Sequence, residues 1–219
     1  MAIQKNKKMK RLIILTVIFN TIALILPAQR TYFETEISGE LFKNIEISLS
    51  PQVRFREEFD LKEYLFDAGA DYKISKYLSL GTSYRLGTNI SRDDEKTTFG
   101  RWSFDAKTSV KLNSLKPSFR LRYTNGNEDF GDDSEENEQY LRYKLELAYS
   151  LSSLNISPYV YTEYFQNIAG DNLDYTRFEG GLDYKLGKHH KLGAYFRTNV
   201  ESDSKEIQRI IGLSYKFKL

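Results

Sequence analysis

Few residues of the chain have the type and spacing that catalysis or metal binding requires. His189 and His190 are the only histidines, and neighbouring residues of a strand point to opposite faces, so the pair favours a polar turn over a metal site. The chain has no cysteine, which excludes disulfides, thiolate metal ligands and cysteine nucleophiles. It also has no glycine-rich phosphate loop and no nucleophile elbow. We therefore predict no catalytic, cofactor-binding or metal-binding residue and no enzymatic activity.

An acidic segment is the second feature that could carry chemistry. Residues 125–138, NGNEDFGDDSEENE, hold seven acidic residues and no basic residue. A calcium site is one interpretation, but the spacing does not match the ligand pattern of an EF-hand loop. We predict a solvated outer loop, with divalent cations shared with surface lipopolysaccharide as the alternative.

Glu163 is the third feature, because three aromatic residues surround it in the sequence: Tyr159, Tyr161 and Phe165. An apolar setting of this kind would suit a general acid. However, the corresponding face of other predicted strands carries four arginines: Arg120, Arg122, Arg142 and Arg177. A buried carboxylate beside guanidinium groups is more typical of a structural ion pair. We therefore predict an interior charge network formed by Glu163 and these four arginines.

The elements that must position these side chains have a period of two, which is the signature of β-strands. Within residues 45–55, for example, Ile, Leu, Pro, Val and Phe alternate with Glu, Ser, Gln and Arg. The same pattern predicts eleven strands near residues 32–41, 45–55, 64–74, 78–88, 101–112, 115–124, 141–151, 154–165, 177–186, 191–200 and 209–219. No apolar-phase position of these segments, from Phe33 to Leu219, is Asp, Glu, Lys or Arg.

Two environments could impose such a face, namely the core of a soluble β-protein and the lipid around a membrane barrel. The connections favour the membrane barrel, because short turns alternate with longer polar segments near 56–62, 89–100, 125–139, 166–176 and 201–208. The hairpins also repeat a Lys-bearing tight turn, at Lys43, Lys76 and Lys188. We predict an all-β chain that forms a single antiparallel up-and-down transmembrane β-barrel of about 10–12 strands. Because bacterial barrels have even strand numbers, either one strand is missing from the count or residues 31–41 are not a full lipid-facing strand.

The first 28 residues have the features of a signal peptide. Lys5, Lys7, Lys8, Lys10 and Arg11 precede an apolar stretch at residues 12–26, which is short for a membrane-spanning helix. We predict a signal peptide at 1–28 and a barrel domain at 29–219. The chain has 32 basic and 30 acidic residues, and the signal peptide contains five of the basic residues and none of the acidic ones. The exported part therefore has 27 basic residues (32 − 5) against 30 acidic ones, a formal charge of −3. This charge argues against nucleic-acid binding.

Three groups of residues carry a resemblance to a known family. They are Pro158-Tyr159-x-x-x-Glu163-x-Phe165, then Arg177-Phe178-x-x-Gly181-Leu182-x-Tyr184-Lys185-Leu186-x-Lys188-His189, and a closing Gly212-Leu213-x-Tyr215-Lys216-Phe217. The chain resembles an uncharacterised family of outer-membrane β-barrels of gram-negative bacteria that carries a domain-of-unknown-function label. The resemblance implies the fold and an outer-membrane location, and it transfers no functional residue.

These observations predict a passive or structural, porin-like barrel or a narrow channel in the cell outer membrane. A binding module that acts through its outer loops is the alternative. A lipid-modifying enzyme is least favoured, because neither histidine lies on the lipid-facing phase near a candidate serine. The expected partners are outer-membrane lipid with lipopolysaccharide and, during biogenesis, the barrel-insertion machinery. The aromatic strand that ends at Leu219 would suit recognition by that machinery.

The leader generates the first testable prediction, which is cleavage after or near Ala28. N-terminal sequencing of the protein extracted from membranes should begin at or close to Gln29. A mature protein that still contains Leu12 would show that this segment is not a cleaved signal peptide.

Overall fold

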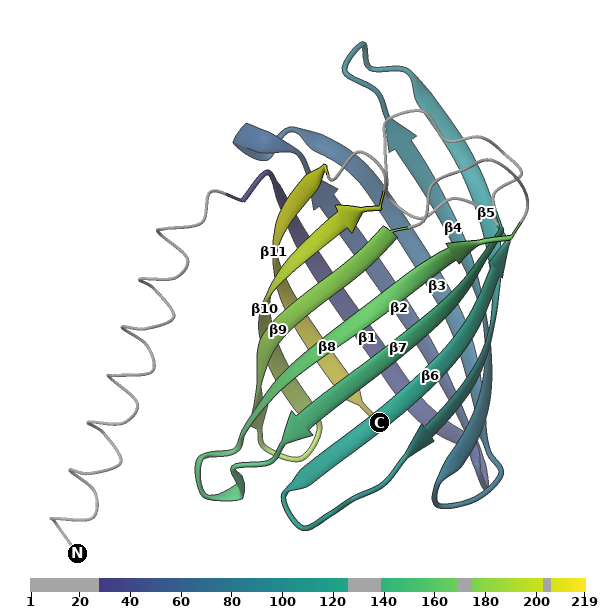
Figure 1. Ribbon diagram of the computed structural model, residues 1–219, viewed down its shortest axis with the longest axis vertical. Coiled ribbons are helices and arrows are strands. Elements are labelled where there is room, and N and C mark those ends of the chain that lie inside the picture. Colours follow the sequence, from purple (N-terminus) through teal and green to yellow (C-terminus); the bar gives the residue numbers. More distant parts are fainter. Residues whose placement is uncertain (1–27, 126–138, 169–174, 203–205) are drawn as a thin grey trace, which may run out of the picture.

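The computed structural model describes residues 28–125, 139–168, 175–202 and 206–219, and these residues form a closed β-barrel (Figure 1). The predicted signal peptide before residue 28 and most of the acidic segment, residues 126–138, lie outside the described residues. The strands are β1 (Arg30–Phe42), β2 (Ile45–Phe55), β3 (Leu61–Lys73), β4 (Leu78–Ile90), β5 (Lys96–Ser109), β6 (Leu115–Asn125), β7 (Gln139–Tyr149), β8 (Ile156–Asn167), β9 (Tyr175–Leu186), β10 (His190–Glu201) and β11 (Ile207–Lys218). Two single 3-10 turns, η1 (Glu57–Phe59) and η2 (Ser152–Leu154), complete the described secondary structure. The predicted all-β barrel is confirmed.

The outer surface of the barrel is made by the apolar phase of the strands. Leu145 and Val160 are 60% and 59% exposed, and large apolar side chains of every described strand are exposed in the same way. The charged phase points inward, where Glu163 and Arg142 are buried. This arrangement is the reverse of a soluble protein and is the one that a lipid environment favours. Among the described residues, no helix is long and apolar enough to cross a bilayer.

The barrel closes with an odd number of strands, and the expectation of an even number is wrong. Ten neighbouring pairs are antiparallel, whereas β1 and β11 run parallel, in a register from Arg30↔Ile210 to Ser38↔Lys218. Residues 31–41 therefore do form a full strand, since β1 pairs with β11 on one side and β2 on the other. The physical reason is that a parallel ladder also pairs backbone N–H and C=O groups. A closed barrel requires only that the first and last strands hydrogen-bond to each other, and they can do so in parallel as well as antiparallel orientation.

The connections separate the barrel into two ends (Figure 1). The turn end carries residues 43–44, 74–77, 110–114, 150–155 and 187–189. The loop end is the end at which the strands on either side of residues 56–60, 91–95, 126–138, 168–174 and 202–206 finish and begin. The contrast in length is smaller than the sequence predicts, because β4 and β5 continue to the pair Ile90↔Lys96 and shorten the connection expected at 89–100. Because the strand number is odd, β1 starts at the loop end and β11 finishes at the turn end.

Local backbone conformation explains two of the tight turns. Asn44, in the two-residue turn between β1 and β2, has φ of +71°, and Gly187, in the turn between β9 and β10, has φ of +75°. Asn and Gly adopt this left-handed region at lower cost than other residues. The neighbouring lysines, Lys43 and Lys188, are exposed at the turn end.

The inside-out arrangement predicts opposite responses to one substitution at two positions of β7. Leu145→Arg would place a cation on the outer face and should destabilise the folded barrel in lipid vesicles by about 2–4 kcal/mol if Leu145 lies near the bilayer midplane. Ala148→Arg, three residues further along, adds the same side chain to the polar cavity and should fold with the stability of the parent. Urea titrations in vesicles measure both, and equal stability of the two variants would contradict the assigned faces.

Candidate functional site

The candidate site is the interior of the barrel, which contains a cavity of about 620 Å³ toward the turn end. The cavity is lined almost entirely by charged and polar side chains. Its boundary toward the loop end includes the buried residues Arg54, Arg142 and Arg177, and its boundary toward the turn end includes Glu46 and Lys116. The interior therefore changes along its length from a buried layer to a region that water reaches.

Glu163 is the centre of one ion cluster and is 1% exposed. Its Oε1 atom accepts hydrogen bonds from Arg120 at 2.7 Å and from Nε of Arg142 at 3.1 Å. The guanidinium of Arg177, which faces Glu163 across β8 and β9, lies 3.9 Å from Oε2. A buried carboxylate with these three cationic neighbours is compensated by charge and by hydrogen bonds.

The structure thus brings together Glu163 and three of the four arginines that the sequence singled out. Arg122 instead forms a bidentate pair with Asp105, at 2.5 Å and 2.6 Å. Cross-strand register explains this choice, since Arg122 lies directly opposite Asp105 on β5. Nε of Arg120 lies 4.0 Å from Asp105, so the two groups are linked through Arg120.

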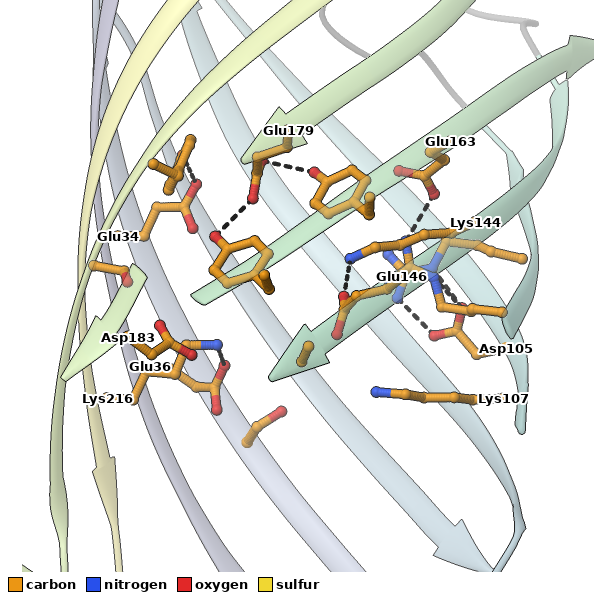
Figure 2. Close-up of a pocket in the computed structure, with 18 of the residues that line it drawn as sticks. Glu34, Glu36, Asp105, Lys107, Lys144, Glu146, Glu163, Glu179, Asp183 and Lys216 are labelled. Atoms are coloured by element: carbon orange, nitrogen blue, oxygen red, sulfur yellow. Dashed lines mark hydrogen bonds and ion pairs between the residues drawn. The ribbon is translucent and has the colours of Figure 1, made fainter. Parts of the chain in front are cut away.

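A second cluster surrounds Glu179, which sequence reasoning did not select. The hydroxyl groups of Tyr159 and Tyr161 donate hydrogen bonds to its two carboxylate oxygens at 2.8 Å and 2.7 Å (Figure 2). Nε of Arg197 also donates to Oε2, at 2.6 Å. The sequence did indicate that Glu179 points into the interior, because it lies two residues from Arg177 on β9 and therefore on the same face. Because the tyrosines lie in the sequence around Glu163, their partner on the next strand could be found only from the register.

Two glycines permit tyrosine rings to lie along the inner wall. A Cβ at Gly181 would be 2.5 Å from the ring of Tyr159, and a Cβ at Gly212 would collide with the ring of Tyr195. Tyr195 donates a hydrogen bond of 2.5 Å to Glu34. These glycines matter here because the backbone is approached closely by a neighbouring side chain.

The loop end of the interior contains a buried layer of aromatic and paired polar side chains. Phe165 and Tyr175 stack with ring centroids 3.9 Å apart, and Tyr140 packs edge-on against both rings. The guanidinium of Arg142 lies 4.2 Å from the centroid of Phe165. On the opposite wall, a buried ion pair of 2.9 Å joins Arg54 and Glu63.

The layer extends around the barrel through four more buried side chains, which are Tyr32, Thr124, Asn199 and Ile210, all at 0% exposure. Side chains of both walls are thus buried at the same end of the interior. None of these four residues lines the cavity.

The two histidines lie at the turn end, as the sequence predicts. Nδ1 of His189 is 2.7 Å from the backbone oxygen of Lys218, and Nδ1 of His190 is 2.8 Å from the hydroxyl oxygen of Tyr215. Within the described part of the chain, no three His, Cys, Asp or Glu residues are grouped so that they could hold a metal ion.

This geometry defines a class of protein, the β-barrel of outer-membrane type, and one of the similar solved structures supports the fold. The β domain of the Bordetella autotransporter BrkA aligns with a TM-score of 0.50 and 16% identity, over 86% of this chain and 96% of that chain. A loop-deletion mutant of OmpT, an outer-membrane protein of Vibrio cholerae, aligns with a TM-score of 0.41 and 11% identity, over 78% of this chain and 62% of that chain.

Sequence comparison then gives the family. The model of the family described as "Protein of unknown function (DUF2490)" matches residues 29–209, and the chain belongs to this family. The search among curated proteins found no match. The resemblance inferred from the tyrosine-rich strands is therefore confirmed.

The Glu163 cluster generates a stability prediction. Glu163→Gln leaves three guanidinium groups without their shared carboxylate and should destabilise the barrel by about 3–5 kcal/mol. Glu36→Gln removes a half-exposed partner of Lys216 and should cost less than about 1 kcal/mol. Urea unfolding in vesicles compares them, and two equal losses would show that the cluster is not a special determinant of stability.

Proposed function

We propose that the protein is a structural outer-membrane β-barrel that is closed to ion flow at its loop end and holds a polar chamber open at its turn end. The buried layer formed around Phe165, Tyr175, Arg142 and Arg54 carries this proposal. Short turns of such barrels face the periplasm, so the chamber would open to the periplasm. The apolar outer face and the predicted signal peptide support the location.

The narrow-channel alternative requires a continuous path of water through the interior. In the described residues, side chains across the loop end are 0–5% exposed and are held by stacking and ion pairs, as at Tyr32, Glu63 and Phe165. Side chains fill the interior of a barrel with about eight strands, and wide channels occur in barrels of 16–18 strands. An eleven-strand barrel with a packed layer of this kind is closer to the filled type.

The binding-module alternative depends on the outer loops. The acidic segment within 126–138 and the connection at 169–174 are its main candidates, and both lie outside the described residues. We retain it as the second function because the strands that flank these segments, β6 with β7 and β8 with β9, are joined at the loop end. A lipid-modifying enzyme has the least support, since both histidines lie at the opposite end and contact backbone or tyrosine.

Conductance in planar bilayers tests the proposal. The purified parent protein should give no stable conductance steps. The double variant Phe165→Ala/Tyr175→Ala removes the stacked pair and should produce discrete steps, because water can then enter the layer. The control Tyr164→Ala/Phe178→Ala changes outward-facing rings of the same two strands and should remain silent. Stable steps from the parent would contradict closure, and silence of the Phe165/Tyr175 variant would show that another part of the layer closes the barrel.

A further inference from the structure

The chamber has an unusual row of like charges on one wall. Lys107 on β5 is paired in register with Arg120 on β6, and Arg120 is paired with Lys144 on β7. Side chains directly opposite each other on neighbouring strands have Cβ atoms only about 4.5–5.5 Å apart, and like charges there are destabilising. A row of three cations therefore requires anionic partners.

The protein supplies such partners to only part of the row. Arg120 donates to Glu163 at 2.7 Å, and Nζ of Lys144 lies 2.8 Å from Oε2 of Glu146. Lys107 has no ion pair or hydrogen bond with the described residues, and Figure 2 shows it reaching into the cavity. The charged groups around it include two cations, Lys116 and Arg120, and two carboxylates, Glu146 and Asp71.

The charge is distributed unevenly around the chamber. On β5, β6 and β7 the cavity lining contains six basic residues and two acidic ones, Asp105 and Glu146. On β1, β2 and β3 the lining contains four acidic residues and one basic residue, Arg54. An anion in the chamber would therefore be attracted to the β5–β7 wall and kept from the opposite wall.

The mouth of the chamber carries charge of the same sign as this wall. Four of the turns at this end each carry an exposed lysine, namely Lys43, Lys76, Lys111 and Lys188. Charges of one sign around a concave opening raise the local concentration of counter-ions and their rate of entry. A cavity volume of 620 Å³ lies within the range of small-molecule sites.

We propose that the β5–β7 wall is a binding site for a small multivalent oxyanion, bearing phosphate or carboxylate groups, that enters from the turn end. Lys107 and Lys116 bind its oxygens directly, and Arg120 and Lys144 complete the positive wall. The acidic wall of β1–β3 limits the ligand to a compact anion or to one whose opposite end is cationic. This inference concerns a ligand and does not depend on whether the barrel conducts.

Calorimetric titration of pyrophosphate into the purified protein in a zwitterionic detergent at low ionic strength tests the proposal, with inorganic phosphate as a weaker probe. We expect saturable binding of one pyrophosphate per barrel. Lys107→Gln should weaken it at least tenfold, and Lys116→Gln should weaken it in the same direction. The control Lys76→Gln removes a charge from the rim but not from the chamber, and its affinity should stay within twofold of the parent.

A thermal-unfolding measurement separates ligand binding from a structural role of Lys107. Without added anion, Lys107→Gln should melt no lower than the parent, because it removes a like-charge contact and no ion pair. Pyrophosphate should raise the melting temperature of the parent and of Lys76→Gln, and the same concentration should raise that of Lys107→Gln clearly less. Absence of saturable binding, or equal weakening by Lys107→Gln and Lys76→Gln, would overturn the proposal, because the rim alone would then account for any attraction.

Discussion

The structure depends on one constraint, which is that a β-sheet in hydrocarbon must leave no edge unpaired. Each unsatisfied backbone N–H or C=O group there costs several kcal/mol. The parallel ladder between β1 and β11 meets this requirement by joining the first strand to the last. Closure then fixes which face of every strand meets lipid, because side chains alternate along a strand. The absence of charge on one phase is a direct consequence.

Closure also explains why the interior is so densely charged. The charged side chains of the strands have only one face available, and the lumen must hold them within reach of one another. Carboxylates consequently serve several cations at once, as Glu163 does for Arg120, Arg142 and Arg177. Where the register sets cations beside one another, as at Lys107, the compensation is incomplete. The electrostatics of the lumen therefore follow from the register of the strands and not only from composition.

This relationship separates what the sequence could predict from what it could not. The period of two predicted the eleven strands and which residues share a face, since these are local properties of each segment. The alternation of short turns and longer polar connections was also needed to predict that the charged face, with Glu163, points inward. The parallel seam was not predictable, because it joins residues such as Thr31 and Ile211 that are far apart in the chain. Likewise, the sequence placed Arg122 on the interior, but only the β5–β6 register shows that Asp105 is its partner. The role of Glu179 required the β8–β9 register for the same reason.

Arginine and lysine are distributed unevenly within the lumen. Among the described residues, the buried cations are Arg54, Lys62, Arg101, Arg142, Arg177 and Arg197, so that arginine predominates among them. The cavity is lined by five lysines and also by three arginines outside the buried set, namely Lys107, Lys116, Lys144, Lys191, Lys216, Arg85, Arg120 and Arg122. A guanidinium can stack on an aromatic ring while it donates to a carboxylate, whereas an ammonium group is strongly hydrated. Arg142 does both, against Phe165 and Glu163. Arginine therefore suits the buried layer, where Arg142 and Arg177 lie against the ring of Phe165, whereas a hydrated ammonium group suits the polar cavity.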